Sequence, residues 1–449
     1  MKIRLLTIFS LLFVISYSLF AEVMMLDNGI KVTTARVNSD KSYITVILDY
    51  SSYDEYIPYD WLPEDWKKVT WLPDYGLPIP GIRQALVNSF SLGFVKDPWL
   101  TFLDLGGTIA FDSTPDFIYL SAVVPKENTA DALKNILTIL TRVPNTTVSL
   151  ASINNVKNFF NNNNTSVKIA FTDIFGPRPY GMFYGNDASY LEMINGSLVT
   201  IVHESVIKPS RATISVVSGL EEQSTKKSIE NVFSAWTGKK NMNWERIPSD
   251  IFIYPEKSRT NLVELDNFNT PQYLCTFLVP HLDSEIYPLA YVMTALLEGI
   301  GGELFRKLRI ENQLTYNYFV NIFDNKEGFL INISVDISEH DFFTVSEIIH
   351  ETTNRFTEEI LSEEKLMRAK NYAITKLLSD SLDPNALSYR NAKELFYFNT
   401  DIFTLETIEK IHGVSTSDIQ NFAKNYMEVR FETVLIPHLK ETREIEVKE

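Results

Sequence analysis

The sequence predicts an α+β protein built from two similar halves, each an antiparallel sheet covered by helices. The first observation is size: 449 residues, 45% of them apolar and 22% charged, are enough for more than one domain with a full core. The second is that strand patterns and apolar helical stripes alternate through both halves. The third is a diverged repeat, because Leu-Asp-Asn occurs at residues 26–28 and 265–267, and comparable strands begin at Phe117 and Phe329.

The N-terminus has the layout of a secretory signal peptide over residues 1–21. Lys2 and Arg4 precede an apolar run, and Ala21 stands before the expected cleavage point. We therefore expect an exported protein, either periplasmic or secreted. Leu19 is an imperfect residue so close to that point, so an uncleaved N-terminal membrane anchor remains an alternative.

The formal charge of −16 at pH 7 argues against a nucleic acid or an anionic membrane surface as partner. Removal of the signal segment, which carries two positive charges and no negative ones, makes the charge −18. An acidic surface favours basic peptides, although solubility alone also explains it. Cys275 is the only cysteine, so the core and not an internal disulfide must stabilise the fold.

After the signal segment, two strand patterns flank an Asn28-Gly29 turn, and a further strand covers residues 42–50. Residues 53–80 then contain five prolines, four tyrosines and three of the six tryptophans. Proline at this density prevents a regular helix or a central strand, so we expect an ordered inserted loop. Its aromatic side chains form either a lid or partner-docking surface, or a local hydrophobic plug.

The remainder of the first half alternates helices and strands. Residues 81–124 predict a helix, a loop, a Gly-Gly turn and two strands, residues 129–141 a helix with an apolar stripe, and residues 212–217 a closing strand. We expect a first domain over 22–220, a linker region over 221–256, a second domain over 257–438 and a charged tail over 439–449.

The segment over residues 81–124 resembles the catalytic segment of the M16 metallopeptidases, the family of insulinase, pitrilysin and the mitochondrial processing peptidase. In that family the helix carries H-x-x-E-H, in which two His on one helical face bind zinc and the Glu activates water. Here those positions hold Gln84, Val87 and Asn88. An amide offers zinc only a weak carbonyl oxygen, and valine neither accepts a proton nor orients water.

The resemblance also implies a third zinc ligand, a Glu further along the chain. The sequence has no Asp or Glu from Ala132 to Thr172, and Asn155 or Asn158 takes the place of that ligand. We therefore expect a pseudoenzyme: two M16-type domains that form one half of a clamshell, without a metal site of their own.

In M16 enzymes the strand after this helix receives the substrate as an added strand, largely through main-chain hydrogen bonds. The resemblance gives this role to Gly106, Gly107, Thr108, Ile109 and Ala110. The two glycines match the family's pair, whereas the family's usual Asn is replaced by Ala110. The alternative is that these residues only form core strands.

In the second half, LFRKLRIENQLTY resembles the family motif L-F-x-x-L-R-E-x-x-G-L-x-Y. Arg309 and Tyr316 fall where M16 C-terminal domains hold an Arg and a Tyr that reach toward the bound peptide and its transition state. The match is incomplete. Directly before this segment the family has an Arg where this chain has Glu303, and the Gly that precedes the last Leu of the motif is Gln313 here. The alternative is that Arg309 pairs with a local acid and Tyr316 is a core residue.

Rival metal or nucleophile motifs are weak. His350-Glu351 begins an H-E-x-x-H pattern, but Asn354 replaces its second His, and the helix around it looks solvated with Ile348 and Ile349 inward. The other histidines lack ligand spacing, and the sequence has no catalytic triad motif, P-loop or dinucleotide fingerprint.

The resemblance covers residues 23–436. A lost zinc helix combined with a retained Arg309 and Tyr316 is similar to the division of labour in heteromeric M16 peptidases. We therefore expect a non-catalytic, peptide-binding subunit that works with a zinc-bearing M16 subunit, or as a homodimer, on a peptide or unfolded protein, with Zn²⁺ on the partner and no cofactor of its own. One alternative is a peptide-binding or structural scaffold, comparable to the M16-like core subunits of respiratory complexes. The other is an active zinc peptidase with ligands elsewhere in the chain.

Overall fold

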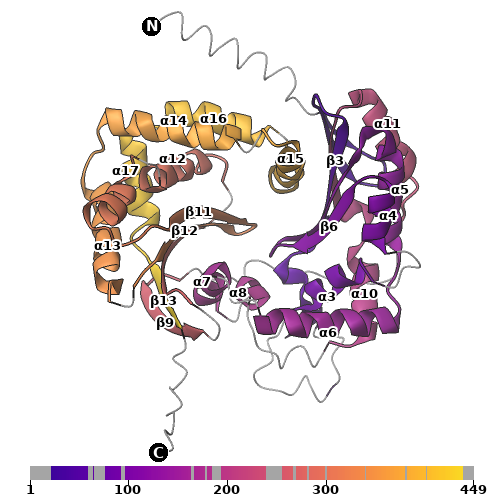
Figure 1. Ribbon diagram of the computed structural model, residues 1–449, viewed down its shortest axis with the longest axis horizontal. Coiled ribbons are helices and arrows are strands. Elements are labelled where there is room, and N and C mark those ends of the chain that lie inside the picture. Colours follow the sequence, from indigo (N-terminus) through magenta and orange to yellow (C-terminus); the bar gives the residue numbers. More distant parts are fainter. Residues whose placement is uncertain are drawn as a thin grey trace, which may run out of the picture. The chain divides into compact units, whose positions relative to one another are not determined.

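The fold is seen in a computed structural model (Figure 1). It describes residues 22–58, 64, 76–92, 97–162, 166–176, 179–184, 194–238, 255–265, 269–280, 283–298, 301–338, 340–379, 382–400 and 402–437. The predicted signal segment, most of the proline-rich insertion and the predicted charged tail lie outside these residues. Within them, no helix has both the length and the apolar character needed to span a membrane.

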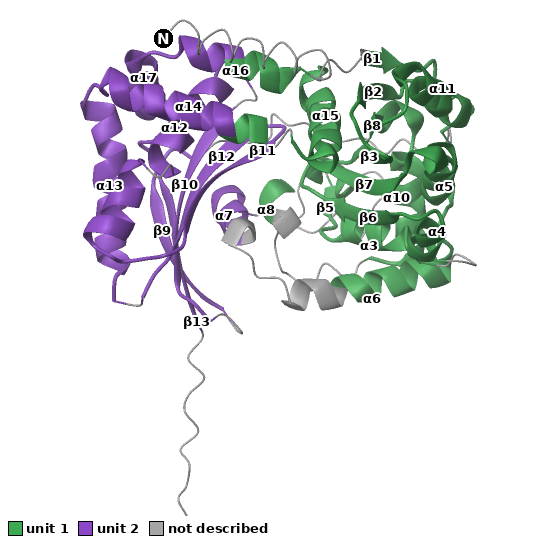
Figure 2. Ribbon diagram, turned by 45° about the horizontal axis from the view of Figure 1, so that its top comes forward, with its two compact units in different colours: residues 1–163, 177–252, 376–408 green, residues 164–176, 253–375, 409–449 purple. Residues whose placement is uncertain are grey.

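The chain forms two compact units, each assembled from three separate segments (Figure 2). Unit 1 contains residues 1–163, 177–252 and 376–408. Unit 2 contains residues 164–176, 253–375 and 409–449. The domain boundaries expected from the sequence remain a prediction.

Unit 1 contains a six-stranded sheet with the order β1-β2-β8-β3-β7-β6. Adjacent strands are antiparallel, except that β2 and β8 run parallel. The strands are β1 (Glu22–Met25), β2 (Lys31–Arg36), β3 (Lys41–Asp49), β6 (Thr108–Ser113), β7 (Phe117–Pro125) and β8 (Ala212–Ser218). The central strand β3 is rich in β-branched residues, which suit a strand buried on both faces.

Helices cover both faces of this sheet. On one face lie α3 (Ile82–Ser89), α4 (Pro98–Asp104), α5 (Thr129–Thr141), α6 (Thr146–Asn162), α10 (Gly196–Val206) and α11 (Glu222–Phe233). On the other face lies α15 (Pro384–Phe398) (Figure 1). Side chains of β3 alternate between the two faces of the sheet. Ile44, Val46 and Leu48 pack in the core under the larger helical layer, and Ile47 packs with Ala392 of α15 on the other face.

Unit 2 contains a five-stranded sheet with the order β11-β12-β10-β13-β9. Only β13 and β9 run parallel among its neighbouring pairs. The strands are β9 (Arg259–Leu265), β10 (Gln272–Pro280), β11 (Tyr318–Asn325), β12 (Gly328–Asp336) and β13 (Phe431–Pro437). One helical layer contacts it through α12 (Tyr287–Glu298), α13 (Phe342–Glu358) and α17 (Thr416–Tyr426), and α7 (Ser166–Phe175) packs on β10 and β13.

The remaining helices connect or cap these layers. They are α8 (Pro179–Tyr184), α14 (Glu363–Ser379), α16 (Phe403–Gly413), the π-helix η6 (Phe305–Glu311) and the 3-10 turns η1 (Ser52–Asp54), η3 (Lys126–Asn128) and η4 (Pro209–Arg211). The boundary between the units falls within α14 and within α16.

The strand orders confirm the predicted repeat, since β2-β8-β3-β7-β6 corresponds to β9-β13-β10-β12-β11, including one parallel pair in each. The alignment of the two Leu-Asp-Asn tripeptides was wrong. The first tripeptide precedes β2, whereas Leu265 ends β9, the strand equivalent to β2. Equivalent strands β3 and β10 begin 231 residues apart, and the helices that follow, α3 and α12, begin only 205 residues apart. The extra length therefore lies between β3 and α3, where the insertion was predicted.

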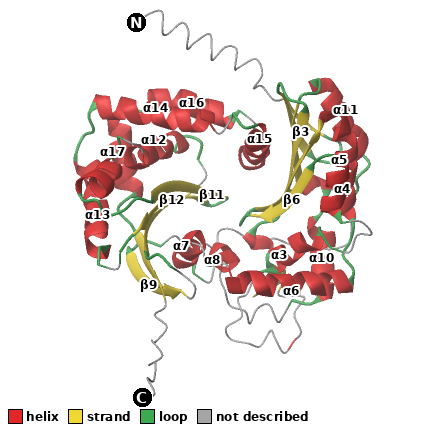
Figure 3. Cartoon of the chain, viewed as in Figure 1, coloured by secondary structure: helices red, strands yellow, loops and turns green. Residues whose placement is uncertain are grey.

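The two described ends of the insertion form a short antiparallel pair, β4 (Tyr56–Pro58) and β5 (Gly76–Pro78). This pair brings the insertion back to the start of α3. Figure 3 colours the helices red and the strands, such as β3 and β6, yellow. The choice between a lid and a plug depends on residues outside the described part, so both interpretations remain predictions.

Two helices are exchanged between the halves of the sequence. α15 comes from the second half, yet Ser388 donates hydrogen bonds to the carbonyls of Tyr43 and Ser215 in the first sheet. α7 comes from the first half, yet its Asp173 accepts a hydrogen bond from the Thr433 hydroxyl in the second sheet, at 2.7 Å. Each sheet therefore has one face covered by a helix from the opposite half of the chain.

Candidate functional site

The helix α3, where the resemblance places zinc ligands, is anchored at its start by the insertion. Gly81 precedes it with a left-handed φ of 94°, which glycine adopts without steric cost. The carboxylate of Glu55 accepts a hydrogen bond from the backbone N–H of Arg83 at 3.2 Å. Glu55 thus satisfies one of the free N–H groups of the first helical turn, as a capping residue does.

A buried charged cluster lies at the start of this helix. The Arg83 side chain is fully buried, lies 3.6 Å from the Glu55 carboxylate and places its guanidinium 5.1 Å from the centre of the Tyr50 ring. Burial raises the pKa of the Glu55 carboxyl, although Arg83 and its N–H oppose the shift. Burial also raises the pKa of Tyr50 well above its usual value. The charged side chain of α3, Arg83, is therefore buried against Glu55 and Tyr50.

The predicted zinc-motif positions are occupied by neutral groups that bind one another. The Gln84 amide donates to the Asn88 carbonyl at 3.4 Å, as expected for residues four apart on one helical face. The Asn88 amide donates to the backbone carbonyl of Ser152 on α6, and the Ser113 hydroxyl donates to Gln84 at 3.5 Å. Val87 is only 3% exposed and packs in the core. This donor set does not fit zinc, because it has no imidazole, thiolate or carboxylate and no base to activate water.

The predicted substitute for the third ligand, Asn155 or Asn158, remains a prediction. Asn155 is exposed, and the side chain of Asn158 lies outside the described residues. The residue of α6 that contacts Asn88 is Ser152, which is buried and donates its hydroxyl to the carbonyl of Val148. In the described ranges, no group of three or more His, Cys, Asp and Glu side chains is arranged to hold a metal ion.

The predicted peptide-binding strand, β6, is an edge strand that pairs with β7. Thr108 and Ala110 have exposed side chains, and Ile109 is buried. The glycine pair before it is required by the backbone. Gly106 has φ of 72°, and a Cβ at Gly107 would lie 2.1 Å from the carbonyl oxygen of Val123. The second edge of β6 is free of strand partners in the described part of the chain, as strand addition requires.

Arg309 and Tyr316 lie together in unit 2. Arg309 is on η6, and its guanidinium carbon is 5.5 Å from the centres of both the Phe305 and Tyr316 rings, within the range of cation–π contact. Tyr316 is 83% exposed, which excludes the alternative that it is a core residue. No ion pair joins Arg309 to a carboxylate among the described residues. Both polar groups are therefore accessible to a ligand.

The backbone around this pair agrees with the motif. Gln313 has a φ of 53°, one of two positive values among described residues other than glycine, and it occupies the position where the M16 motif has Gly. A left-handed conformation favours glycine, which explains sterically why the motif has Gly at this position. In this chain Gln313 adopts the same conformation in spite of its side chain. The π-helical winding of η6 is of a kind frequent at functional sites.

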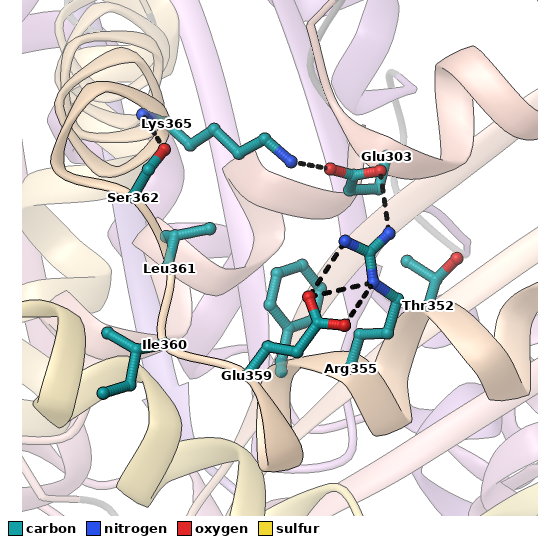
Figure 4. Close-up of a pocket in the computed structure, with 9 residues that line it drawn as sticks. Glu303, Thr352, Arg355, Glu359, Ile360, Leu361, Ser362 and Lys365 are labelled. Carbon is teal, nitrogen blue, oxygen red and sulfur yellow. Dashed lines mark hydrogen bonds and ion pairs between the residues drawn. The ribbon is translucent and has the colours of Figure 1, made fainter.

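Glu303, which stands where the family motif has an Arg, is the centre of a network of ion pairs around η6. Its carboxylate contacts Arg306 at 3.1 Å. It also contacts Arg355 at 3.7 Å and Lys365 (Figure 4). Burial would raise the pKa of Glu303, but hydrogen bonds from Lys365 and Arg306 outweigh it, and the pKa is lowered. Glu303, Arg355 and Lys365 line a pocket of about 210 Å³. The network holds η6 on α13 and α14.

Sequence reasoning missed Glu55 and Phe305. No local pattern links Glu55 to α3, because 28 residues separate it from Arg83. Phe305 had a usable signal, since it precedes Arg309 by four positions and side chains at that spacing meet on a helix. The helix face around His350 was expected to be solvated, but the His350 Nε2 lies 2.8 Å from the Glu432 carboxylate, whereas Ile348 and Ile349 are buried as expected.

The comparisons with known proteins agree with this geometry. Residues 200–372 match the family model of the peptidase M16 inactive domain. No curated protein matches the sequence. Three similar solved structures are a protease from Helicobacter pylori, a peptidase M16 inactive domain from Pseudomonas fluorescens and a chain of complex III2 from Candida albicans with Inz-5 bound.

These three structures show the fold. The H. pylori protease has a TM-score of 0.78 at 14% identity, with 93% of this chain and 100% of that chain covered. For the P. fluorescens protein the values are 0.72, 15%, 94% and 98%, and for the C. albicans chain 0.69, 14%, 92% and 95%. The chain therefore has the fold of these M16-like structures over nearly its whole length, and its residues 200–372 match the M16 inactive domain.

Proposed function

We propose that this chain is the non-catalytic, peptide-binding subunit of a heteromeric zinc metalloendopeptidase, exported to a periplasm or secreted. The zinc and the base that activates water would come from a second M16 subunit. This chain would supply the Arg309 and Tyr316 side chains and a strand edge for the peptide.

The observation that carries the proposal is the contrast between two sets of side chains. The family's zinc positions hold amides and a buried valine, whereas Arg309 and Tyr316 are accessible and lie beside each other. A guanidinium donates two parallel hydrogen bonds to a carboxylate or binds a peptide carbonyl, and a phenol donates to an oxygen that gains negative charge. These are supporting roles that require a zinc ion held elsewhere.

Substrate binding is proposed at β6. Its free edge provides main-chain donors and acceptors for an extended peptide, a mode of recognition that does not need the missing zinc ligands. Gly106 and Gly107 permit the tight turn that starts the strand. A peptide or an unfolded segment, which can become a strand, is the substrate class that this edge accepts.

The test is reconstitution with an M16 subunit that carries an intact H-x-x-E-H helix. The isolated chain should not cleave a quenched fluorescent peptide, and the mixture should exceed the zinc subunit alone. Arg309→Ala and Tyr316→Phe should each lower kcat of the mixture about 100-fold, the usual effect of losing one transition-state donor. Arg368→Ala is the matched control, because Arg368 is an exposed Arg of the same unit. Chelator-sensitive cleavage by the isolated chain, with bound zinc, would contradict the proposal.

A second candidate is a peptide-binding or structural scaffold without a peptidase partner. The fold shared with a chain of complex III2 favours it, since that structure is described as a complex. For this candidate, partners recovered with the chain would contain no zinc peptidase, and the two substitutions would leave any reconstituted activity unchanged.

A further inference from the structure

A row of aromatic rings runs from the core of unit 1 to its surface beside β6. The Phe90 ring, directly after α3, is buried and lies 6.2 Å from the ring of Phe111 on β6. The Trp99 ring on α4 lies 5.8 Å from the same Phe111 ring, in an edge-to-face arrangement, and is 48% exposed. The row thus ends in a large aromatic side chain that is only half covered.

The outer face of α4 continues this apolar surface. Leu100 is 52% exposed and Leu103 is 64% exposed. Leu103 is four residues from Trp99 and three from Leu100, so its side chain neighbours both of them on the helix. Phe102, on the opposite face, fills the core. A surface helix normally exposes polar residues on this face, so three large apolar side chains beside a free strand edge indicate a contact surface.

The register of β6 assigns its side chains to two faces. Ile109 and Phe111 belong to the face that packs on the helical layer, whereas Thr108, Ala110 and Asp112 alternate with them on the other face. The Thr114 N–H donates to the Phe117 carbonyl at the turn, which makes this a hydrogen-bonded pair. Such pairs alternate along an antiparallel ladder, so the main-chain groups of Ile109, Phe111 and Ser113 point to the free edge.

Asp112 gives the second face a negative charge. Its carboxylate accepts hydrogen bonds from the Tyr119 hydroxyl at 3.3 Å and from the Ser113 N–H at 2.7 Å, but no cation pairs with it in the described ranges. A cation on a neighbouring strand would complement it, because oppositely charged cross-strand pairs are stabilising.

We propose that β6 selects extended peptide segments in which apolar and basic side chains alternate, the apolar ones on Trp99 and Phe111 and a basic one on Asp112. This inference rests on the proposed function, whose substrate class it narrows. Charge complementarity and the two-faced pattern of the edge determine this occupant, and a second copy of this chain paired through β6 is the competing one.

The probe is a fluorescein-labelled synthetic peptide of about ten alternating Lys and Val residues, long enough to span β6, with binding measured by fluorescence anisotropy on the full chain. Four comparison peptides replace Lys with Glu, replace Val with Ser, carry N-methyl groups on one alternate set of amides, or carry them on the other set. The Lys-Val peptide should bind most tightly. N-methylation of one set should abolish binding, and of the other set should not, because only alternate amides face β6.

Protein variants then test the two faces separately. Asp112→Asn should weaken binding of the Lys-Val peptide about two- to fivefold, the range of a cross-strand charge pair, and Asp112→Lys should reverse the preference in favour of the Glu-Val peptide. Trp99→Ala should weaken binding about tenfold, as expected for an aromatic contact residue. Glu127→Gln and Leu150→Ala are matched controls, an exposed acid and an equally exposed apolar residue of the same unit, and should change nothing.

The outcomes separate this inference from the function on which it rests. If all peptides bind equally and only N-methylation matters, strand addition stands and the side-chain selection is overturned. If neither set of N-methyl groups weakens binding, both are overturned. Concentration-dependent dimerisation that competes with the peptide and is lost in Phe111→Pro would also overturn the inference, because a second copy would then occupy the edge.

Discussion

Unit 1 and unit 2 share a strand order, yet they place their charged side chains in opposite ways. In unit 1, the charged groups at α3 form the buried Arg83–Glu55 pair, and the positions that carry zinc ligands in M16 enzymes hold the neutral amides of Gln84 and Asn88. In unit 2, the network around Glu303 is half exposed, and Arg309 faces solvent. We infer that the buried cluster stabilises unit 1, whereas α3 forms with neutral residues at its outward positions.

The largest expected effect tests the buried cluster. Arg83→Met should lower the free energy of unfolding by about 3–5 kcal/mol, because it leaves the Glu55 carboxylate buried without its cation. Urea unfolding followed by tryptophan fluorescence measures this for unit 1, since all six tryptophans belong to it.

The control is the double variant Arg83→Met with Glu55→Gln. It should recover a large part of the loss, since the two side chains are in contact and their effects are not additive. A double variant whose loss equals the sum of the single losses would show that the two groups do not interact.

The next effect tests whether the core around Val87 on α3 can still accept the Glu of the family motif. Val87→Glu should destabilise unit 1 by about 3 kcal/mol, because the new carboxylate would enter an apolar core without a partner. Asn88→His, at a half-exposed position, should cost less than about 1 kcal/mol. If the chain tolerated Val87→Glu as well as Val87→Leu, the position would still be able to hold a general base.

A smaller effect is expected in the half-exposed network of unit 2. Glu303→Gln should lower stability at pH 7 by about 1 kcal/mol, because solvent screens the partner cations. The folded pKa of Glu303 is depressed, so its contribution is complete above the pKa of an unfolded Glu, about 4.3, and is lost as the pH falls through the folded pKa. Thermal unfolding followed by circular dichroism should show the gap between the two proteins narrowing below about pH 4. A gap that is independent of pH would contradict the network.

The smallest effect concerns the backbone beside Tyr316. Gln313→Gly should stabilise unit 2 by about 0.5 kcal/mol, because relief of the left-handed conformation exceeds the added freedom of the unfolded chain. Asn399→Gly is the control. Asn399 has a similar φ of 55°, but Asn tolerates it, so the change there should be close to zero. Destabilisation by Gln313→Gly would mean that the Gln side chain has a role of its own.

Much of the fold was predictable because its signals are local. Period-two strands, the Asn28-Gly29 turn and the apolar stripe of α5 all depend on neighbouring residues, and the helix that carries Gln84 and Asn88 was found where expected. The exchange of α7 and α15 was not predictable, since a helical pattern shows which face is apolar but not which sheet it covers. The capping of α3 by Glu55 was missed for a similar reason, as its cause lies 28 residues away.

The crossed placement of α7 and α15 imposes an order on folding. During synthesis, the apolar residues Ile47 and Phe117 on one face of the first sheet stay uncovered until residues 384–398 emerge, long after β3 and β7 have been made. A chain that lacks α15 would expose this apolar face and would be prone to aggregate, so α15 protects the sheet as well as packing on it.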